Sequence, residues 1–98
     1  MVSSIRLLDH VTRCSTYEDG AIIHRLVKNA LEKGDKVEVS FDGVLSAPSA
    51  FINGALIELL NDYPFSYIRE NVVISNSTRH LNELIKQRFE FASKLNTD

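Results

Sequence analysis

The chain has 98 residues, 44% of them hydrophobic and 24% charged, and its formal net charge at pH 7 is -2. This composition is typical of a single globular domain with a modest core, and it excludes a mainly disordered chain. The charge balance gives no electrostatic reason to expect nucleic acid or an anionic membrane as a partner.

Two elements are predicted in the first third of the chain. Residues 3–9 carry three apolar side chains and are predicted to form a short strand. A helix is predicted to begin near Ser15 or Thr16, because Ser15 and Glu18 have the spacing of a capping box.

The body of this first helix shows one apolar stripe. Its positions recur at helical spacing and are Ile22, Ile23, Leu26, Val27, Ala30 and Leu31. Gly34 is well placed as the left-handed residue that follows the helix end. Gly20, in the first turn, is a poor helix former, which indicates either close packing or fraying there.

The middle of the chain is predicted to form a strand, a tight loop and a second helix. Apolar and polar side chains alternate over residues 36–42, which is typical of a strand with one dry face. A loop of mostly small residues covers residues 43–48, and Ser49 is predicted to cap a helix over residues 49–61. Gly54 lies in the apolar stripe of this helix, where we expect it to allow close approach to the sheet.

The last third of the chain is predicted to end in a third helix. Residues 61–70 hold three aromatic side chains and are expected to lie over an edge of the core, and residues 72–74 follow as a short buried strand. Residues 76–78 offer caps for the helix, and the chain is a tail from Leu95 onward. The apolar positions of this helix are Leu81, Leu84, Ile85, Phe89, Ala92 and Leu95.

The predicted order is therefore β-α-β-α-β-α, within a single domain that covers residues 1–98. Such alternation favours an α/β fold with a mainly parallel sheet and right-handed crossovers. The polar face of the strand over residues 36–42 indicates that one face of the sheet is poorly covered. We therefore expect the helices to lie mostly on the other face.

No catalytic or ligand-binding motif stands out in the sequence. It lacks glycine-rich phosphate loops and the HExxH, GxSxG and CxxC patterns. His10, His24, His80 and Cys14 share no metal-ligand spacing, so we expect a non-enzymatic protein without a cofactor or a metal. Cys14 is the only cysteine, which excludes an intrachain disulfide, and the first ten residues contain no long apolar run. These features favour a cytoplasmic protein.

The loop over residues 43–48 and the helix start after it are the best candidate site. Free N–H groups and the positive end of a helix dipole are expected there. Asp42 could act as an acid or a metal ligand, although an aspartate before a glycine is more often a turn residue. Ser46 and Ser49 could be phosphorylation or contact sites, and the simpler interpretation of Ser49 is an N-cap.

The stretch KVEVSFDGVLSAPSAFINGALIELL resembles the STAS fold, and more closely a STAS-like family known only as a domain of unknown function. In that family a strand ends in an aspartate and a glycine, and a small-residue loop leads to a Ser-x-Phe helix start. The matching residues are Asp42, Gly43, Ser49 and Phe51. The upstream segment is similar at Thr12, Arg13, Asp19 and Gly20, and VVISNS fits the stretch before the last helix.

Better-known STAS domains are anti-anti-sigma factors and parts of anion transporters. The resemblance implies a regulatory module that binds a protein partner, for which a histidine-kinase-like ATPase is the candidate. In the anti-anti-sigma factors, the second serine of an Asp-Ser-Ser-Gly loop is phosphorylated. Aligned without gaps, those four positions are taken here by Pro48, Ser49, Ala50 and Phe51, so alanine replaces the phosphorylated serine.

Three functions stay open from the sequence. The first is docking of a partner protein through the loop, with phosphorylation as a regulator. The second is binding of a nucleotide or another anion at the helix start, and the third is a small hydrolase or transferase that uses Asp42. The candidate site residues are Asp42, Gly43, Ser46, Ser49, Asn53 and Arg13. A homodimer is a further option, because Tyr63, Phe65 and Tyr67 could form an apolar patch or could cover the core.

Overall fold

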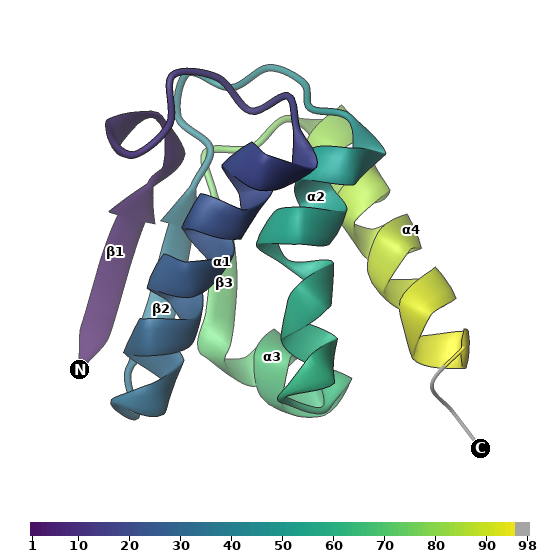
Figure 1. Ribbon diagram of the computed structural model, residues 1–98. Helices are drawn as coiled ribbons and strands as arrows, with labels where there is room; N and C mark the ends of the chain where they lie inside the picture. Colours follow the sequence, from purple (N-terminus) through teal and green to yellow (C-terminus); the bar gives the residue numbers. More distant parts are fainter. Residues whose placement is uncertain (96–98) are drawn as a thin grey trace.

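A parallel sheet of three strands forms one layer of the fold, and the helices form the other (Figure 1). The computed structural model describes residues 1–95. The tail was predicted to begin at Leu95, but Leu95 is the last residue of the final helix, and the rest of the predicted tail lies outside the described residues. The elements, where η denotes a short 3-10 helix, are β1 (Val2–Arg6), η1 (Leu7–Asp9), α1 (Tyr17–Glu32), β2 (Lys36–Ser40), α2 (Ser49–Ala55), η2 (Ile57–Asn61), α3 (Phe65–Asn71), β3 (Val72–Ser75) and α4 (Arg79–Leu95). The strand order is β1-β2-β3 and both pairings are parallel, which confirms the predicted α/β fold.

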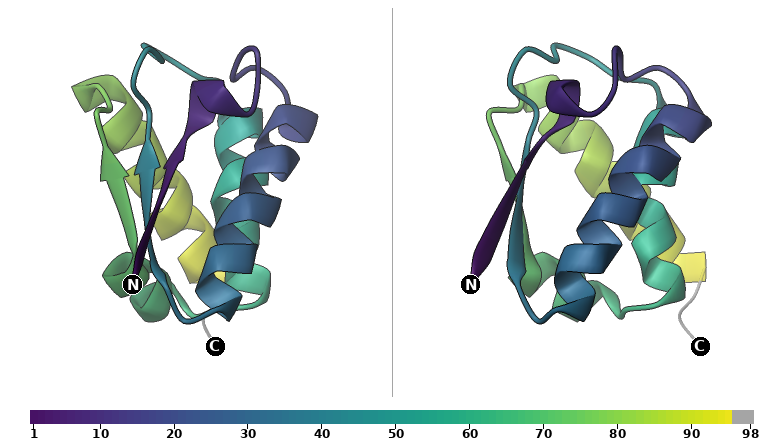
Figure 2. Two further views of the ribbon diagram at one scale, coloured as in Figure 1. Left: turned by 90° about the vertical axis from the view of Figure 1, so that its left-hand side faces the viewer. Right: turned by 60° about the vertical axis from the view of Figure 1, so that its left-hand side comes forward.

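The helices lie on one face of the sheet, as predicted (Figure 2). Both crossovers step in the same direction across the sheet, so connections of the same hand place their helices on the same face. Val37 and Val39 of β2 point into that face and are fully buried. Glu38 and Ser40 are half-buried on the opposite face, which the helices leave uncovered.

The strands differ from the predicted ones in their ends and in their burial. β1 ends at Arg6, where the chain turns into η1, and β2 ends at Ser40 rather than at Asp42. The prediction of a buried third strand is wrong. β3 is an edge strand, and Val73 is 54% exposed on the uncovered face of the sheet.

A capping box closes the first turn of α1, one residue later than predicted. The Thr16 Oγ1 accepts a hydrogen bond from the Asp19 N–H at 3.0 Å, and the Asp19 carboxylate accepts one from the Thr16 N–H at 3.3 Å. Thr16 is the extended residue before the helix, so the predicted pairing of Ser15 with Glu18 is wrong. Ser15 instead contacts the Asp19 carboxylate, with its N–H and its hydroxyl each at 3.4 Å.

Replacing the capping residue should weaken the fold measurably. A Thr16→Ala variant is expected to lose about 1 kcal/mol of unfolding free energy, because the Asp19 N–H then has no side-chain acceptor. Ser15→Ala is the matched control and should cost less, since its contacts are long. Urea unfolding followed by circular dichroism measures both losses, and equal losses would contradict this assignment of the cap.

Two glycines allow α1 and α2 to pack closely together. A Cβ atom at Gly20 would lie 2.5 Å from the Phe51 carbonyl oxygen, and one at Gly54 would lie 2.6 Å from the Tyr17 carbonyl oxygen. Gly20 therefore serves close packing, which was one of its two interpretations. The expected contact of Gly54 with the sheet is wrong, because Gly54 faces α1.

The second predicted helix is divided into two shorter segments. α2 ends at Ala55, and η2 continues the chain to Asn61. Residues three apart share one face of a 3-10 helix, and this spacing brings Leu56 and Leu59 into the core together. The following residues form α3, which the sequence did not predict; its N-cap is Pro64.

Candidate functional site at the carboxyl ends of the strands

Three connecting segments meet beyond the carboxyl ends of the three strands, at the top of Figure 1. They are residues 7–16 after β1, residues 41–48 after β2, and residues 76–78 after β3. Parallel strands end at a common edge of the sheet, which is why segments distant in the sequence become neighbours there. The loop predicted as the site is the middle one of the three.

A tight turn follows β2 and includes two of the predicted site residues. The Val44 N–H donates to the Phe41 carbonyl oxygen at 2.8 Å, and Asp42 and Gly43 lie between these two residues. Gly43 has a φ of 84°, which glycine adopts far more readily than other residues. A Cβ atom here would also lie 2.8 Å from the Leu8 Cδ1 atom. Gly43 therefore shapes the turn, and any substitution would disturb it.

Asp42 is held by an arginine on the neighbouring strand. The Arg6 Nε lies 3.1 Å from the Asp42 Oδ2, and the Arg6 Nη1 lies 2.9 Å from the Asp9 Oδ1. These hydrogen bonds, with Asp42 first and Asp9 second, raise the pKa of Arg6. The three side chains are exposed, so the cluster orients the end of β1 toward the turn and adds little stability. The contact that the structure shows for Asp42 therefore positions the turn against the end of β1.

The loop after this turn is anchored at both sides of an exposed leucine. Val44 and Ala47 are buried, whereas the Leu45 side chain between them is 78% exposed. The Thr78 hydroxyl donates to the Leu45 carbonyl oxygen at 3.2 Å and accepts from the Leu81 N–H at 3.1 Å. This contact ties the loop to the start of α4. The loop therefore presents a large apolar side chain to solvent on a held backbone.

A shallow depression beside the loop brings three predicted residues together. Its volume is about 350 Å³, and its lining consists of Leu8, Thr12, Arg13, Cys14, Gly43, Val44, Leu45 and Ser46. Arg13, Gly43 and Ser46 are all exposed there. Burial, together with the nearby charge of Asp19, raises the pKa of Cys14 to about 11. The thiol is therefore protonated at neutral pH, and it is a poor nucleophile.

Ser49 and Asn53 lie outside this depression. Ser49 is exposed as the first residue of α2, whose N-cap is Pro48, so the predicted capping role of Ser49 is wrong. The Asn53 Oδ1 accepts a hydrogen bond from the Arg88 Nε at 3.1 Å. Asn53 therefore joins α2 to α4, and its side chain is engaged away from the loop.

Sequence reasoning missed Leu45, whereas Thr78 was among the predicted caps of the last helix, and its hydrogen bond from the Leu81 N–H confirms that role. A large apolar residue inside a loop of small residues was the available signal for Leu45. No local pattern could have revealed the second role of Thr78, because its hydrogen bond to the Leu45 carbonyl oxygen spans 33 positions in the chain.

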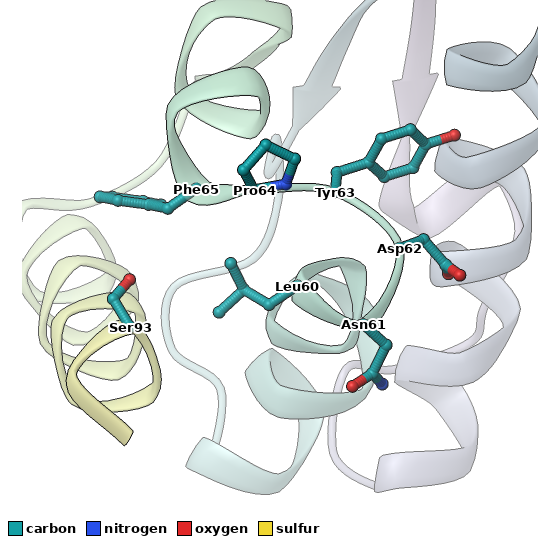
Figure 3. A pocket seen from close by; sticks show the side chains of 7 residues that line it. All are labelled: Leu60, Asn61, Asp62, Tyr63, Pro64, Phe65 and Ser93. Atoms are coloured by element: carbon teal, nitrogen blue, oxygen red, sulfur yellow. The ribbon is translucent and has the colours of Figure 1, made fainter. Parts of the chain in front are cut away.

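A second hollow lies at the other end of the molecule, where η2 meets α3 (Figure 3). Its volume is about 480 Å³, and its lining consists of Leu60, Asn61, Asp62, Tyr63, Pro64, Phe65 and Ser93. Figure 3 shows Asn61 and Asp62 pointing away from Ser93. The Asp62 carboxylate lies 3.2 Å from the Lys28 Nζ on α1. Polar groups therefore do not converge in this hollow as they do in a typical ligand site.

The aromatic side chains near this corner cover the core. The Tyr63 and Tyr67 rings stack at 5.1 Å, and the Phe65 ring stacks on Phe89 at 5.2 Å. Tyr63, Phe65 and Tyr67 are half-buried and pack against the core cluster. Of the two interpretations of these residues, an exposed apolar patch or a cover for the core, the structure shows the second.

Residues 1–95 contain neither a metal-binding cluster nor a helix that could cross a membrane. Within them, no three His, Cys, Asp or Glu side chains are grouped so that they could hold a metal ion. The helices in the same part of the chain are each too short or too polar to cross a membrane.

The fold and the site together define a small α/β domain with one uncovered sheet face and a loop site at the ends of its parallel strands. The family model of the STAS-like domain of unknown function (DUF4325) matches residues 19–82, and the chain belongs to this family. The match covers more than half of the chain, including the loop, and confirms the resemblance found in the sequence. No curated protein and no solved structure matches the chain.

Proposed function

We propose that this protein is a non-catalytic regulatory module that docks a partner protein through residues 43–49. The observation that carries this proposal is the exposed Leu45 side chain on an anchored loop. Transfer of a leucine side chain out of water is worth about 1.5–3 kcal/mol. A loop that is already held in place loses less conformational entropy on binding than a mobile one.

The surroundings of Leu45 also suit a protein partner. Thr12, Arg13 and Ser46 are exposed polar residues that line the same depression as the leucine, and interfaces commonly combine an apolar centre with a polar rim. The resemblance to anti-anti-sigma factors favours a histidine-kinase-like ATPase as the partner, within a family that is STAS-like and of unknown function. The Asp42 carboxylate is already bound by Arg6, and the Cys14 thiol is protonated at neutral pH. Neither side chain is therefore placed for catalysis, which favours a role in recognition.

Phosphorylation of an exposed serine near the loop is the proposed means of regulation. Ser46 and Ser49 are both exposed, whereas Ala50, at the aligned position, has no hydroxyl group. A phosphate would add a charge of about -1.5 to -2 beside the apolar Leu45 side chain. The partner would then have to desolvate that charge, and docking would weaken.

Anion binding at the start of α2 is the second candidate function, and the geometry favours it less. α2 has only seven residues, so its dipole is small. The Phe51 and Ile52 N–H groups both donate to the Pro48 carbonyl oxygen. Only Ser49 and Ala50 therefore remain in the first turn to offer N–H groups to an anion.

Replacing the exposed leucine tests the docking proposal. Leu45→Asp is expected to weaken partner binding at least tenfold, because a carboxylate replaces the apolar anchor. Its unfolding free energy should change by no more than about 0.5 kcal/mol, since the side chain is exposed. The measurement is affinity capture from native lysate with quantitative mass spectrometry, followed by a titration of the purified partner.

Val2→Asp is the matched control, because Val2 is also exposed but lies at the opposite end of β1. It should leave binding unchanged. Ser49→Glu should weaken the same capture and Ser49→Ala should not, if phosphorylation regulates docking. Identical partner sets for the wild type and Leu45→Asp would exclude the loop as the docking surface.

A further inference from the structure

An apolar groove runs beside the outer edge of β3, between this strand, α3 and α4. Its volume is about 240 Å³, and its lining consists of Leu56, Phe65, Ile68, Arg69, Val72, Ile74, Asn82, Ile85, Lys86 and Phe89. Small-molecule sites usually measure about 300–1,000 Å³. The groove is below this range, and its size suits one or two side chains of a polypeptide.

The strand beside this groove has an open edge. The Ser75 carbonyl oxygen accepts a hydrogen bond from the Phe41 N–H, so the main-chain groups of Ser75 face the β2 side. Alternate residues of a strand direct their main-chain groups to opposite edges, so Ile74 directs its N–H and carbonyl outward. No strand pairs with that edge within residues 1–95. The Val72 N–H on the same edge already donates to the Ile68 carbonyl oxygen of α3, so the Val72 carbonyl and the Ile74 N–H and carbonyl are the groups that another extended chain can pair with.

On this edge of β3, the residues whose main-chain groups face outward also have side chains that line the groove. Val72 and Ile74 pair with the buried Val37 and Val39, so their side chains lie on the helix-covered face and line the groove. An added strand would place every second side chain on the same face. Those side chains would enter the groove while the main chain pairs with β3.

The rim of the groove carries positive charge. Arg69 lies over the Phe65 ring at 5.8 Å, and Lys86 lines the opposite wall on α4. The groove lining contains no acidic side chain, and Glu83 and Glu90 lie with Lys86 around a separate depression on α4. A ligand with a carboxylate would therefore complement the rim.

We propose that the groove binds an extended segment of a partner protein, in which apolar residues alternate and at least one Asp or Glu is present. This segment adds to the sheet as a fourth strand beside β3. A second copy of the chain fits less well. Pairing β3 with β3 would bring together the Arg69 and Lys86 side chains of both copies, and β1 carries Arg6 and no acidic residue.

The test is selection of displayed random heptapeptides on the full chain. Enriched peptides should alternate apolar residues and contain a carboxylate. Fluorescence polarisation with the best enriched peptide should then show at least tenfold weaker binding to Lys86→Glu and to Arg69→Glu. N-methylation of alternate main-chain amides in the peptide should also weaken binding, because an added strand donates hydrogen bonds through them.

Arg25→Glu is the matched control, because Arg25 is an exposed arginine on α1, away from the groove. It should change the affinity less than twofold, and so should Leu45→Asp, which separates this site from the loop. The proposal is overturned if the enriched peptides lack alternating apolar residues and a carboxylate. It is also overturned if Lys86→Glu and Arg69→Glu bind the peptide as tightly as the wild type does. It is also overturned if size-exclusion chromatography with light scattering shows a dimer that Lys86→Glu dissociates.

Discussion

A Phe51→Ala variant is expected to lose about 3–5 kcal/mol of unfolding free energy. The Phe51 ring is 0% exposed, so its removal leaves a cavity in the core. A domain of this size is stable by about 5–15 kcal/mol, so the variant keeps only a fraction of its stability. Urea unfolding at 25 °C, followed by circular dichroism, measures the loss.

Phe91→Ala is the control for this prediction, because it removes the same side chain from a surface position. Phe91 is 55% exposed, and the Arg88 guanidinium lies 5.4 Å from the centre of its ring. The expected loss is below about 1 kcal/mol, as for an exposed cation–π contact. Similar losses in the two variants would show that Phe51 is not a core residue in solution.

Gly20→Ala is expected to destabilise the fold by about 1–3 kcal/mol or more, although alanine is the better helix former. The new Cβ atom would lie 2.5 Å from the Phe51 carbonyl oxygen and 2.8 Å from the Ala55 nitrogen. Both are main-chain atoms, so the helices themselves must separate. Overpacking of this kind typically outweighs the gain of about 1 kcal/mol in helix propensity. Thermal and urea unfolding measure the net change.

Asn29→Ala is the control for Gly20→Ala, because Asn29 is exposed in the same helix. It should change the unfolding free energy by no more than about 0.5 kcal/mol. A Gly20→Ala protein as stable as the wild type would mean that α1 and α2 pack less closely in solution. Gly54→Ala should resemble Gly20→Ala, since it meets the Tyr17 carbonyl oxygen from the other side.

Features that depend on local periodicity could be predicted from the sequence. The alternation around Val37 and Val39 predicted β2, and the stripe containing Ile23 and Val27 predicted α1. Both patterns follow from the geometry of a single element, so neighbouring residues suffice to reveal them. Gly34 was also predicted correctly as the left-handed residue after α1, with a φ of 84°.

Predictions that required a choice between adjacent residues were less accurate. Ser15 and Thr16 are both good caps, and the structure uses Thr16 with Asp19. The two alternatives differ by little local free energy, so packing of the helix decides between them. The break at Leu56 was also not predicted, because the apolar spacing of Leu56 and Leu59 suits one face of an α-helix as well as of a 3-10 helix.

The sequence indicated which segment contains the candidate site, but it did not reveal the contacts between distant residues that shape the site. The sequence indicated the turn at Asp42 and Gly43 and the loop after it. The contact of Arg6 with Asp42 joins residues 36 positions apart, and the loop surface depends on the distant Thr78. Ser49 is in the right segment but does not cap α2, and Asn53 binds Arg88 instead of facing the loop.

The amino-acid sequence alone settled the order of the three strands and of α1, α2 and α4, the parallel α/β class and the STAS-like family, because periodicity and short motifs are local properties. Tertiary contacts decided where α2 ends and that Gly54 packs against α1. They also decided that Leu45 is exposed to solvent and that the edge of β3 borders an apolar groove. These features depend on pairs of residues far apart in the chain, and their free energies exist only once the elements have packed.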